Sequence, residues 1–280
     1  MSKTLKTPLR YPGGKSRACT KISTSFPDFR QYKEYREPFL GGGSVALFVS
    51  KLNPDLDIWV NDLYKPLTNF WQQLQHSGQE LQDEVKSLKD KHPDPDSARE
   101  LFKQSKEEIN DETKSDFYRA VIFYVLNKCS FSGLTEGSSF SPQASNSNFS
   151  YRGIEKLAEY SKLIENWKIT KLDYRELYSN SRDVFMYLDP PYEISDNLYG
   201  KKGSMHKYFD HQEFAQTCDQ HAASQLISYN SSQLIKDRFK DWNVSEFDHT
   251  YTMRSVGDYM SDQQDRKELL VFNYENTGSA

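Results

Sequence analysis

The chain has 280 residues and a mass of 32.7 kDa, which is enough for one α/β core and an additional lobe. Its net charge of -4 excludes a uniformly basic protein, so any surface for a polyanion must be a local patch. The three cysteines, Cys19, Cys129 and Cys218, are odd in number and far apart, which indicates neither disulfides nor a zinc site. We therefore expect a reducing, cytoplasmic compartment, no metal and no membrane segment.

Five short apolar runs are typical of β-strands, and helical patterns lie between most of them. The runs lie around 34–37, 57–61, 184–188, 225–229 and 268–273. Alternating strands and helices predict an α/β fold, in which helices cover both faces of a mostly parallel sheet.

The N-terminal run 12–16 (PGGKS) is similar to the end of a phosphate-binding loop, but its spacing argues against one. The GxxxxGK[ST] pattern needs a glycine five residues before Gly14, and that position is Leu9. A P-loop ATPase is therefore the weaker hypothesis. Lys15 either donates to a carboxylate near the sheet edge or is an exposed lysine after a turn.

Residues 37–44 (EPFLGGGS) lie where a strand gives way to the helical pattern VALFVSKL. Glycines at a helix N-terminus allow the backbone to approach a ligand closely. Asp62 ends the next strand, 25 residues beyond Glu37. In nucleotide-binding βαβ units, an acid at about this distance accepts hydrogen bonds from ribose hydroxyls. The alternative is a glycine-rich turn with a helix-capping serine and a strand-end aspartate.

Between about 64 and 128 the pattern changes to helices only, broken at 92–95 (HPDP), which predicts an inserted helical lobe. Residues 130–152 are rich in Ser, Asn and Gly and predict an exposed loop or a short hairpin. A second polar loop over 193–208 carries Lys201, Lys202 and Lys207. These lysines either neutralise phosphates of a bound polyanion or belong to a solvated turn.

The segment 187–192 (YLDPPY) is the sharpest feature, because an apolar strand runs directly into an acid, two prolines and an aromatic residue. Consecutive prolines lack N–H donors and leave carbonyls free to accept hydrogen bonds. If the Asp189 carboxylate and the Pro190 carbonyl each accept one N–H of adenine N6, that nitrogen is drawn toward tetrahedral geometry. Tyr192 would stack on the base, which must first flip out of its duplex. The alternative is a strand that ends in a Pro-rich turn.

These motifs together resemble the Dam-like DNA adenine-N6 methyltransferases, from about Leu5 to Tyr274. The matching segments, in the order of that family, are LRYPGGK (9–15), EPFLGGGSVAL (37–47), Asp62, LNKCSFSGL (126–134), YLDPPY (187–192), FDHQEF (209–214), LISYN (226–230) and ELLVFNY (268–274). The resemblance implies a Rossmann-like methyltransferase fold. It divides the chain into a catalytic S-adenosylmethionine-binding domain (1–63 and 165–280) and a target-recognition lobe (64–164).

The same resemblance assigns roles to individual residues. S-adenosylmethionine, which leaves as S-adenosylhomocysteine, would be bound by Tyr11, Lys15, Glu37, Phe39, Gly41, Asp62 and Asp189. The catalytic motif would be Asp189, Pro190 and Tyr192. The partner would be double-stranded DNA, with a separate cognate restriction endonuclease left open.

The chain departs from GATC-specific members of that family after the LN motif. Those members usually carry Asn-Gly-Leu-x-Arg, whose Arg reads a guanine, whereas this chain has Ser132-Gly133-Leu134-Thr135-Glu136. Glu cannot donate to guanine but can accept from cytosine N4. We therefore expect a target other than GATC, contacted by Ser132, Leu134, Glu136 and Arg152.

Two other functions are compatible with parts of the sequence. Methylation of RNA or of a glutamine side chain would use a similar motif around a planar NH2 group, although the Asp at 189 and the large insert favour adenine in DNA. A catalytically silent DNA-binding protein is the other alternative, and the intact Asp62, Asp189 and Tyr192 argue against it.

Overall fold

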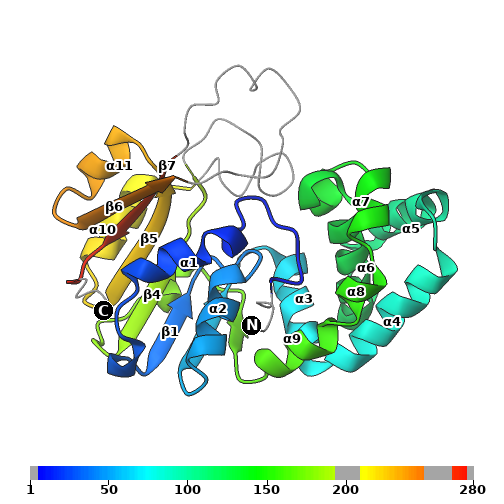
Figure 1. Ribbon diagram of the computed structural model, residues 1–280, viewed down its shortest axis with the longest axis horizontal. Coiled ribbons are helices and arrows are strands. Elements are labelled where there is room, and N and C mark those ends of the chain that lie inside the picture. Colours follow the sequence, from blue (N-terminus) through cyan, green and yellow to red (C-terminus); the bar gives the residue numbers. More distant parts are fainter. Residues whose placement is uncertain (1–5, 193–208, 249–266, 276–280) are drawn as a thin grey trace.

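A seven-stranded sheet organises the chain in the computed structural model, which describes residues 6–192, 209–248 and 267–275 (Figure 1). The strand order is β3-β2-β1-β4-β5-β7-β6, with the first five strands parallel and β7 antiparallel to both neighbours. The strands are β1 Glu34–Glu37, β2 Asp57–Asn61, β3 Lys168–Thr170, β4 Val184–Leu188, β5 Ser224–Asn230, β6 Asn243–Asp248 and β7 Lys267–Phe272.

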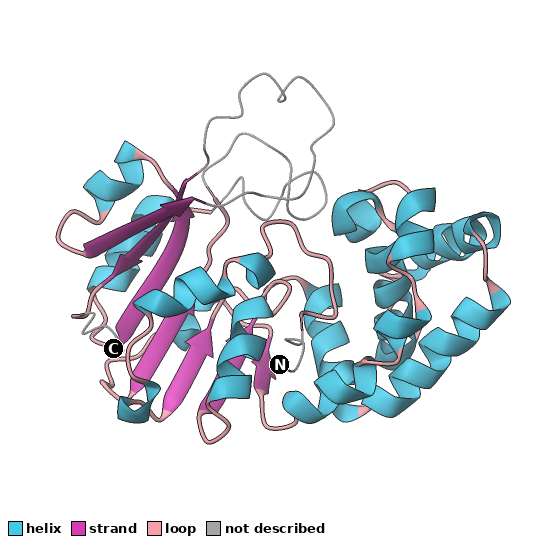
Figure 2. Ribbon diagram, in the orientation of Figure 1, coloured by secondary structure: helices cyan, strands magenta, loops and turns pink. Residues whose placement is uncertain are grey.

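Helices cover both faces of this sheet (Figure 2). Every residue of β4 is buried, and its side chains alternate between two apolar clusters: Phe185 and Tyr187 face one, while Met186 faces the other. Helices α1 (Cys19–Ile22) and α2 (Ser44–Leu52) contribute to the first cluster, and α10 (His211–Asp219) and α11 (Gln233–Arg238) to the second. The predicted α/β, Rossmann-like fold class is confirmed.

Two of the strands were not predicted, and both lack a clear apolar pattern. Strand β3 has only three residues, none of them fully buried. Strand β6 lies at the edge of the sheet, where half-buried residues alternate with exposed ones. Short or polar edge strands are set by pairing with a neighbour, so their own sequence carries little signal.

Helices α3 to α9 lie between β2 and β3 and form a lobe beside the sheet (Figure 1). The helical pattern predicted between about 64 and 128 corresponds to α3 to α6, with a break between α4 and α5, and α6 is buried from Ala120 to Cys129. Every helix in the described ranges is too short or too polar to cross a bilayer. The lobe contains α3 Lys65–His76, α4 Gly78–Lys91, α5 Pro95–Glu108, α6 Asp116–Cys129, α7 Pro142–Ser147, α8 Tyr151–Ile154 and α9 Leu157–Leu163.

Residues 130–152 differ from the predicted loop or hairpin. An antiparallel bridge between Ser130 and Phe140 closes a hairpin-like turn, but short helices occupy most of the segment. Ser141 and Ser150 cap α7 and α8 by accepting backbone N–H bonds, and Phe149 is fully buried. A Ser-rich composition is thus used for helix caps as well as for loops. The 3-10 helices in the described part of the chain are Lys15–Arg17, Ser23–Ser25, Phe29–Gln31, Phe131–Gly133, Thr135–Gly137 and Tyr174–Leu177.

Candidate active site

Three strand ends meet at one edge of the sheet. Strand β1 lies between β2 and β4, and the parallel register pairs Glu37 with Val60 and Arg36 with Met186. The segments that follow these strands therefore converge, and they carry the glycine turn, Asp62 and Asp189. The chain leaves β1 toward β2 and later returns to β4 on the other side, which is the switch point where open α/β sheets bind ligands.

A pocket with about 960 Å³ of empty space, part of it open to solvent, lies at this edge. Every residue predicted to bind the cofactor lines it, and so does the predicted catalytic Pro190. Tyr192 does not line the pocket but contacts Lys15, which does. The predicted residues in the lining are Tyr11, Lys15, Glu37, Phe39, Gly41, Asp62, Asp189 and Pro190.

The turn between β1 and α2 requires glycine. Gly41 and Gly43 have φ values of +49° and +67°, a region that L side chains rarely adopt. A Cβ on Gly41 would lie 2.9 Å from the Tyr11 ring, so this ring packs directly on the turn. The backbone N–H of Gly41 donates to Asp62 at 2.8 Å, which ties the turn to the end of β2.

Asp62 is buried, with 8% of its surface exposed, and both carboxylate oxygens accept backbone N–H bonds. Burial raises the pKa of Asp62 to about 6, although the N–H groups of Tyr64 and Gly41 oppose the shift. Each carboxylate oxygen can accept a second hydrogen bond, so the group can hold the turn and also receive hydroxyl donors.

Asp189 receives two hydrogen bonds on the same oxygen. Lys15 Nζ donates to Asp189 Oδ1 at 2.9 Å and Ser228 Oγ donates to it at 2.8 Å. The hydroxyl of Tyr187 lies 2.9 Å from Ser228 Oγ and fixes that serine from the other side. No hydrogen bond to Asp189 Oδ2 is found within the described residues, and the side chain is 22% exposed, so this oxygen is available as an acceptor.

Lys15 joins Asp189 to a second buried carboxyl group. Its Nζ donates to the Tyr192 hydroxyl at 2.7 Å, and that hydroxyl donates to Glu268 Oε2 at 2.8 Å. Burial by itself lowers the pKa of Lys15, but the charges of Asp189 and Glu268 outweigh burial and raise it above its ordinary value. Lys15 therefore stays protonated and holds Asp189 and Tyr192 in place.

Glu37 is a further buried carboxyl group beside the pocket. It is 2% exposed and accepts a hydrogen bond from the Tyr35 hydroxyl at 2.6 Å. Burial raises the pKa of Glu37 well above its ordinary value.

Several residues of the site were not singled out by sequence reasoning. Tyr174 and Phe209 are two of them, and they form an aromatic wall with the predicted Phe39. Their ring centroids lie 5.3 and 5.7 Å from that of Phe39. The buried side chain of Asn61 donates to the Pro38 and Leu172 carbonyls and fixes the chain below the pocket. In the sequence, Phe209 is marked only as the first residue of FDHQEF (209–214). No local pattern marks Tyr174 or Asn61.

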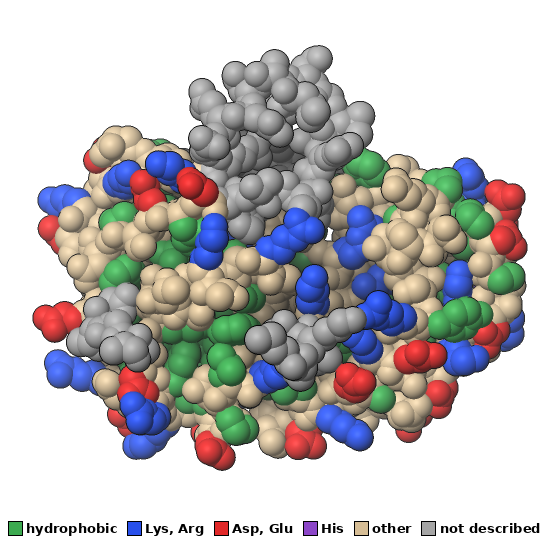
Figure 3. Space-filling model, in the orientation of Figure 1, with side chains coloured by type: hydrophobic (Ala, Val, Ile, Leu, Met, Phe, Trp, Pro, Cys, Tyr) green, Lys and Arg blue, Asp and Glu red, His purple; other side chains and the backbone are tan. Residues whose placement is uncertain are grey.

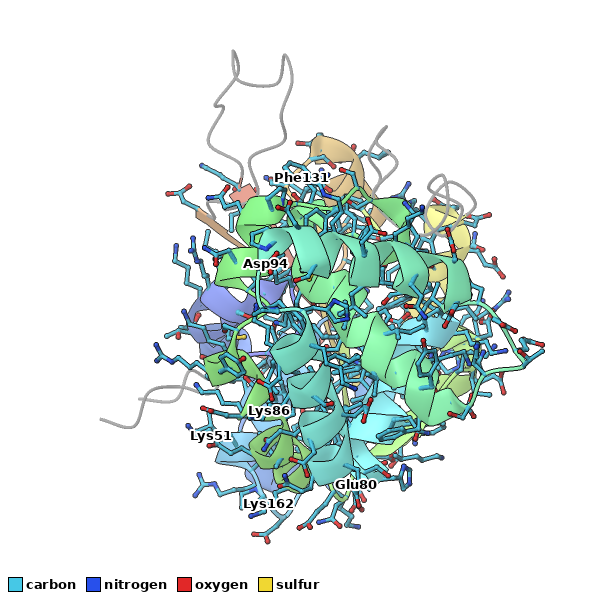
Figure 4. The ribbon with its side chains drawn as sticks, turned by 90° about the vertical axis from the view of Figure 1, so that its right-hand side faces the viewer. Lys51, Glu80, Lys86, Asp94, Phe131 and Lys162 are labelled. Atoms are coloured by element: carbon cyan, nitrogen blue, oxygen red, sulfur yellow. The ribbon has the colours of Figure 1, made fainter. Side chains whose placement is uncertain are left out.

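The predicted DNA-contacting residues lie on the helical lobe. Ser132, Leu134 and Glu136 belong to or flank the two 3-10 turns after α6 and are half-buried, and Arg152 is exposed on α8. Figure 4 shows Phe131 of this segment at the opposite end of the lobe from Glu80, near the start of α4. Lys201, Lys202 and Lys207 lie outside the described residues.

The family model described as "D12 class N6 adenine-specific DNA methyltransferase" matches residues 11–253, which include the glycine turn, Asp62, the helical lobe and Asp189. The chain belongs to this family. This D12 class methyltransferase therefore acts on adenine in DNA. The family excludes the two alternative substrates, RNA and a glutamine side chain.

Named relatives of this D12 class methyltransferase are consistent with the family. It is 27% identical to the type II methyltransferase M.MjaIII of Methanocaldococcus jannaschii, over 66% of this chain and 68% of that protein. It is 25% identical to the type II methyltransferase M1.LlaDCHI of Lactococcus lactis subsp. cremoris, over 95% of each chain. It is also 25% identical to the modification methylase StsI of Streptococcus sanguinis, over 98% of this chain and 43% of that protein.

Proposed function

We propose that this enzyme transfers a methyl group from S-adenosylmethionine to N6 of an adenine flipped out of double-stranded DNA. One observation carries the proposal: Asp189 and Pro190, at the end of β4, line the same pocket as the glycine turn and Asp62. The residues that would accept hydrogen bonds from an amino group and the residues that would bind the cofactor therefore line a single cavity.

The pocket residues suit S-adenosylmethionine chemically. Asp62 offers a buried carboxylate to ribose hydroxyls, and the Phe39 wall offers an apolar surface to an adenine ring. The carboxylates near Lys15 compensate the positive charge of a sulfonium group. When bound, S-adenosylmethionine supplies an electrophilic methyl group.

Asp189 is placed to activate the target nitrogen. Because Lys15 and Ser228 occupy Oδ1, the second oxygen can accept one N6–H while the Pro190 carbonyl accepts the other. These two bonds direct the nitrogen lone pair away from the ring plane. Asp189 Oδ2 could also accept the proton that N6 must lose.

Tyr192 remains a proposed stacking residue for the flipped base. Its hydroxyl is held between Lys15 and Glu268, and its ring centroid lies 5.9 Å from that of Tyr229. Fixing the hydroxyl at one end restricts the ring, which lowers the entropy cost of stacking a base against it.

We assign residues 1–63 and 165–280 to catalysis and 64–164 to target recognition. Basic side chains gather where the N-terminal segment crosses toward the helical lobe, on the face shown in Figure 3. Such a patch supplies phosphate contacts despite the net charge of -4. Ser132, Leu134, Glu136 and Arg152 would contact DNA from the lobe, and Lys201, Lys202 and Lys207 from a segment outside the described residues.

We further propose that the enzyme modifies DNA beside a separate cognate restriction endonuclease, because its relatives are type II and modification methylases by name. We also propose a reducing, cytoplasmic compartment, because the three cysteines are buried and free rather than joined in disulfides.

Mapping N6-methyladenine in a host that lacks adenine methylation tests the proposal. Expression of the chain should place the modification at one recurring sequence other than GATC. Asp189→Ala should lower the rate on plasmid DNA by roughly 10² to 10³ because it removes the amino-group acceptor. Modification confined to GATC would contradict the proposed target, and full activity of Asp189→Ala would exclude the mechanism.

A further inference from the structure

Tyr64 connects the cofactor pocket to the segment that follows α6. Its backbone N–H donates to Asp62 Oδ1 at 3.0 Å, at the rim of the pocket. Its hydroxyl donates to Glu136 Oε2 and lies 3.3 Å from Thr135 Oγ1. Its ring centroid lies 6.3 Å from that of Phe123 in the buried helix α6, so the side chain is fixed along its length.

The segment that Tyr64 contacts has an unusual backbone. Ser132 and Thr135 have φ values of 55° and 51°, which are rare for residues other than glycine and rarest for a β-branched residue. A conformation of this kind persists only where the surroundings hold it, and it is common in functional segments. Gly133 packs so closely on Arg10 that a Cβ would lie 2.6 Å from the Arg10 carbonyl oxygen. Arg10 and Tyr64 thus hold the segment from two sides.

Glu136 keeps one oxygen for another donor. Tyr64 bonds to Oε2, and no hydrogen bond to Oε1 is found within the described residues. The Tyr64 bond orients the carboxylate, and the side chain is only half-buried. A carboxylate held in this way accepts from amino groups and rejects carbonyl groups. In the major groove, amino donors are found on cytosine N4 and adenine N6.

We propose that Tyr64 is a positioning residue for target recognition: its hydroxyl holds Glu136 and the strained segment 132–136, so that Glu136 Oε1 accepts from an amino group of a target base pair. The inference rests on the proposed function, in which this segment contacts DNA. It adds Tyr64, which is not among the residues proposed to contact DNA, and it explains how a Glu can serve where GATC-specific relatives are expected to use an Arg.

Tyr64→Phe tests the role because it removes only the hydroxyl and keeps the ring and the backbone N–H. Initial rates are measured on a duplex with the mapped wild-type target and on duplexes that each carry one changed base pair. We expect discrimination at one position to fall about tenfold or more, since the variant lacks one hydrogen bond to a charged group. The effect should appear in KM for DNA more than in kcat.

Tyr118→Phe is the matched control, because the Tyr118 hydroxyl donates to Glu108 at 2.6 Å within the same lobe. It should leave discrimination at every position unchanged. Glu136→Ala should reproduce the Tyr64→Phe pattern at the same base pair, and it decides the question if Tyr64→Phe does not fold. Wild-type discrimination in Tyr64→Phe, or in Glu136→Ala if Tyr64→Phe does not fold, would overturn the inference while leaving the enzyme's function intact. A wild-type chain that methylates no DNA would instead overturn the proposed function.

Discussion

Lys15 places one positive charge next to two carboxyl groups from distant parts of the sequence. It is 3% exposed, bonds to Asp189 directly and reaches Glu268 through the Tyr192 hydroxyl. Removing one partner of a buried ion pair leaves the other without compensation, which costs more than the pair itself contributes. The lysine therefore matters both for the fold and for the position of Asp189.

Lys15→Met should lower the free energy of unfolding by about 3 kcal/mol, because it leaves buried carboxyl groups unpaired. The pKa of Glu268, which burial already raises and the Lys15 charge opposes, should rise further, so the acid limb of the rate against pH should move to higher pH. Urea unfolding and single-turnover rates measure the two effects. Lys33→Met, which removes an ion pair between exposed Lys33 and Asp183, should change neither. Reduced stability with an unshifted pH profile would limit Lys15 to a structural role.

At the scale of elements, the site depends on the turn between β1 and α2 and on the end of β2. Asp62 closes this arrangement by accepting the Gly41 N–H, and its burial raises its pKa from 3.8 to about 6. The folded chain thus binds this proton more tightly than the unfolded chain. The resulting contribution to stability is fully present below about pH 4 and is lost as the pH rises through about 6. Neutral pH therefore costs stability but supplies the carboxylate that ligand hydroxyls need.

Affinity for S-adenosylhomocysteine should fall as the pH decreases through about 6, because protonated Asp62 is a poorer acceptor. Asp62→Asn should bind about tenfold more weakly at pH 7.5 and show little change between about pH 5 and 8. Isothermal titration calorimetry at several pH values measures both. If the variant keeps the wild-type pH dependence, another group is responsible for it.

At the scale of the whole molecule, the chain combines buried acidic groups at the candidate site with positive charge at the surface. The candidate site contains the buried carboxyl groups of Glu37 and Asp62, whereas binding of DNA needs positive charge at the surface. The chain accommodates both by keeping its overall charge negative and gathering Lys and Arg on the face of Figure 3 between the sheet and the helical lobe. The sequence adds Lys201, Lys202 and Lys207 in the segment that follows the proposed catalytic motif.

Replacing Lys201, Lys202 and Lys207 by Ala should reduce the slope of log K against log salt for duplex binding by about 2.7, or roughly 0.9 for each phosphate that a lysine no longer neutralises. Fluorescence anisotropy over a salt series measures the slope. The control with equal charge change replaces Lys51 on α2, Lys86 on α4 and Lys162 on α9, which Figure 4 shows well away from Phe131. Equal slopes in the two triple variants would remove the proposed phosphate contacts.

The sequence by itself was sufficient for the fold class and for most of the residues that line the candidate pocket. Apolar runs marked the buried strands, and parallel strands present their carboxyl ends at one edge, so Glu37, Asp62 and Asp189 could be expected to meet. The glycine turn was also predictable, because positive φ values restrict the residue type. These features depend on local patterns and on geometry common to all such sheets.

Only the tertiary structure showed the partners of those residues. Glu268 faces the site because β7 runs antiparallel to β5, in a register that pairs Glu268 with Asn230. Ser228, which also lies on β5, donates to Asp189. The aromatic wall around Phe39 and the Tyr64–Glu136 contact likewise join residues far apart in the chain. Such contacts depend on strand register and on the packing of the lobe, and neither leaves a periodic signal in the sequence.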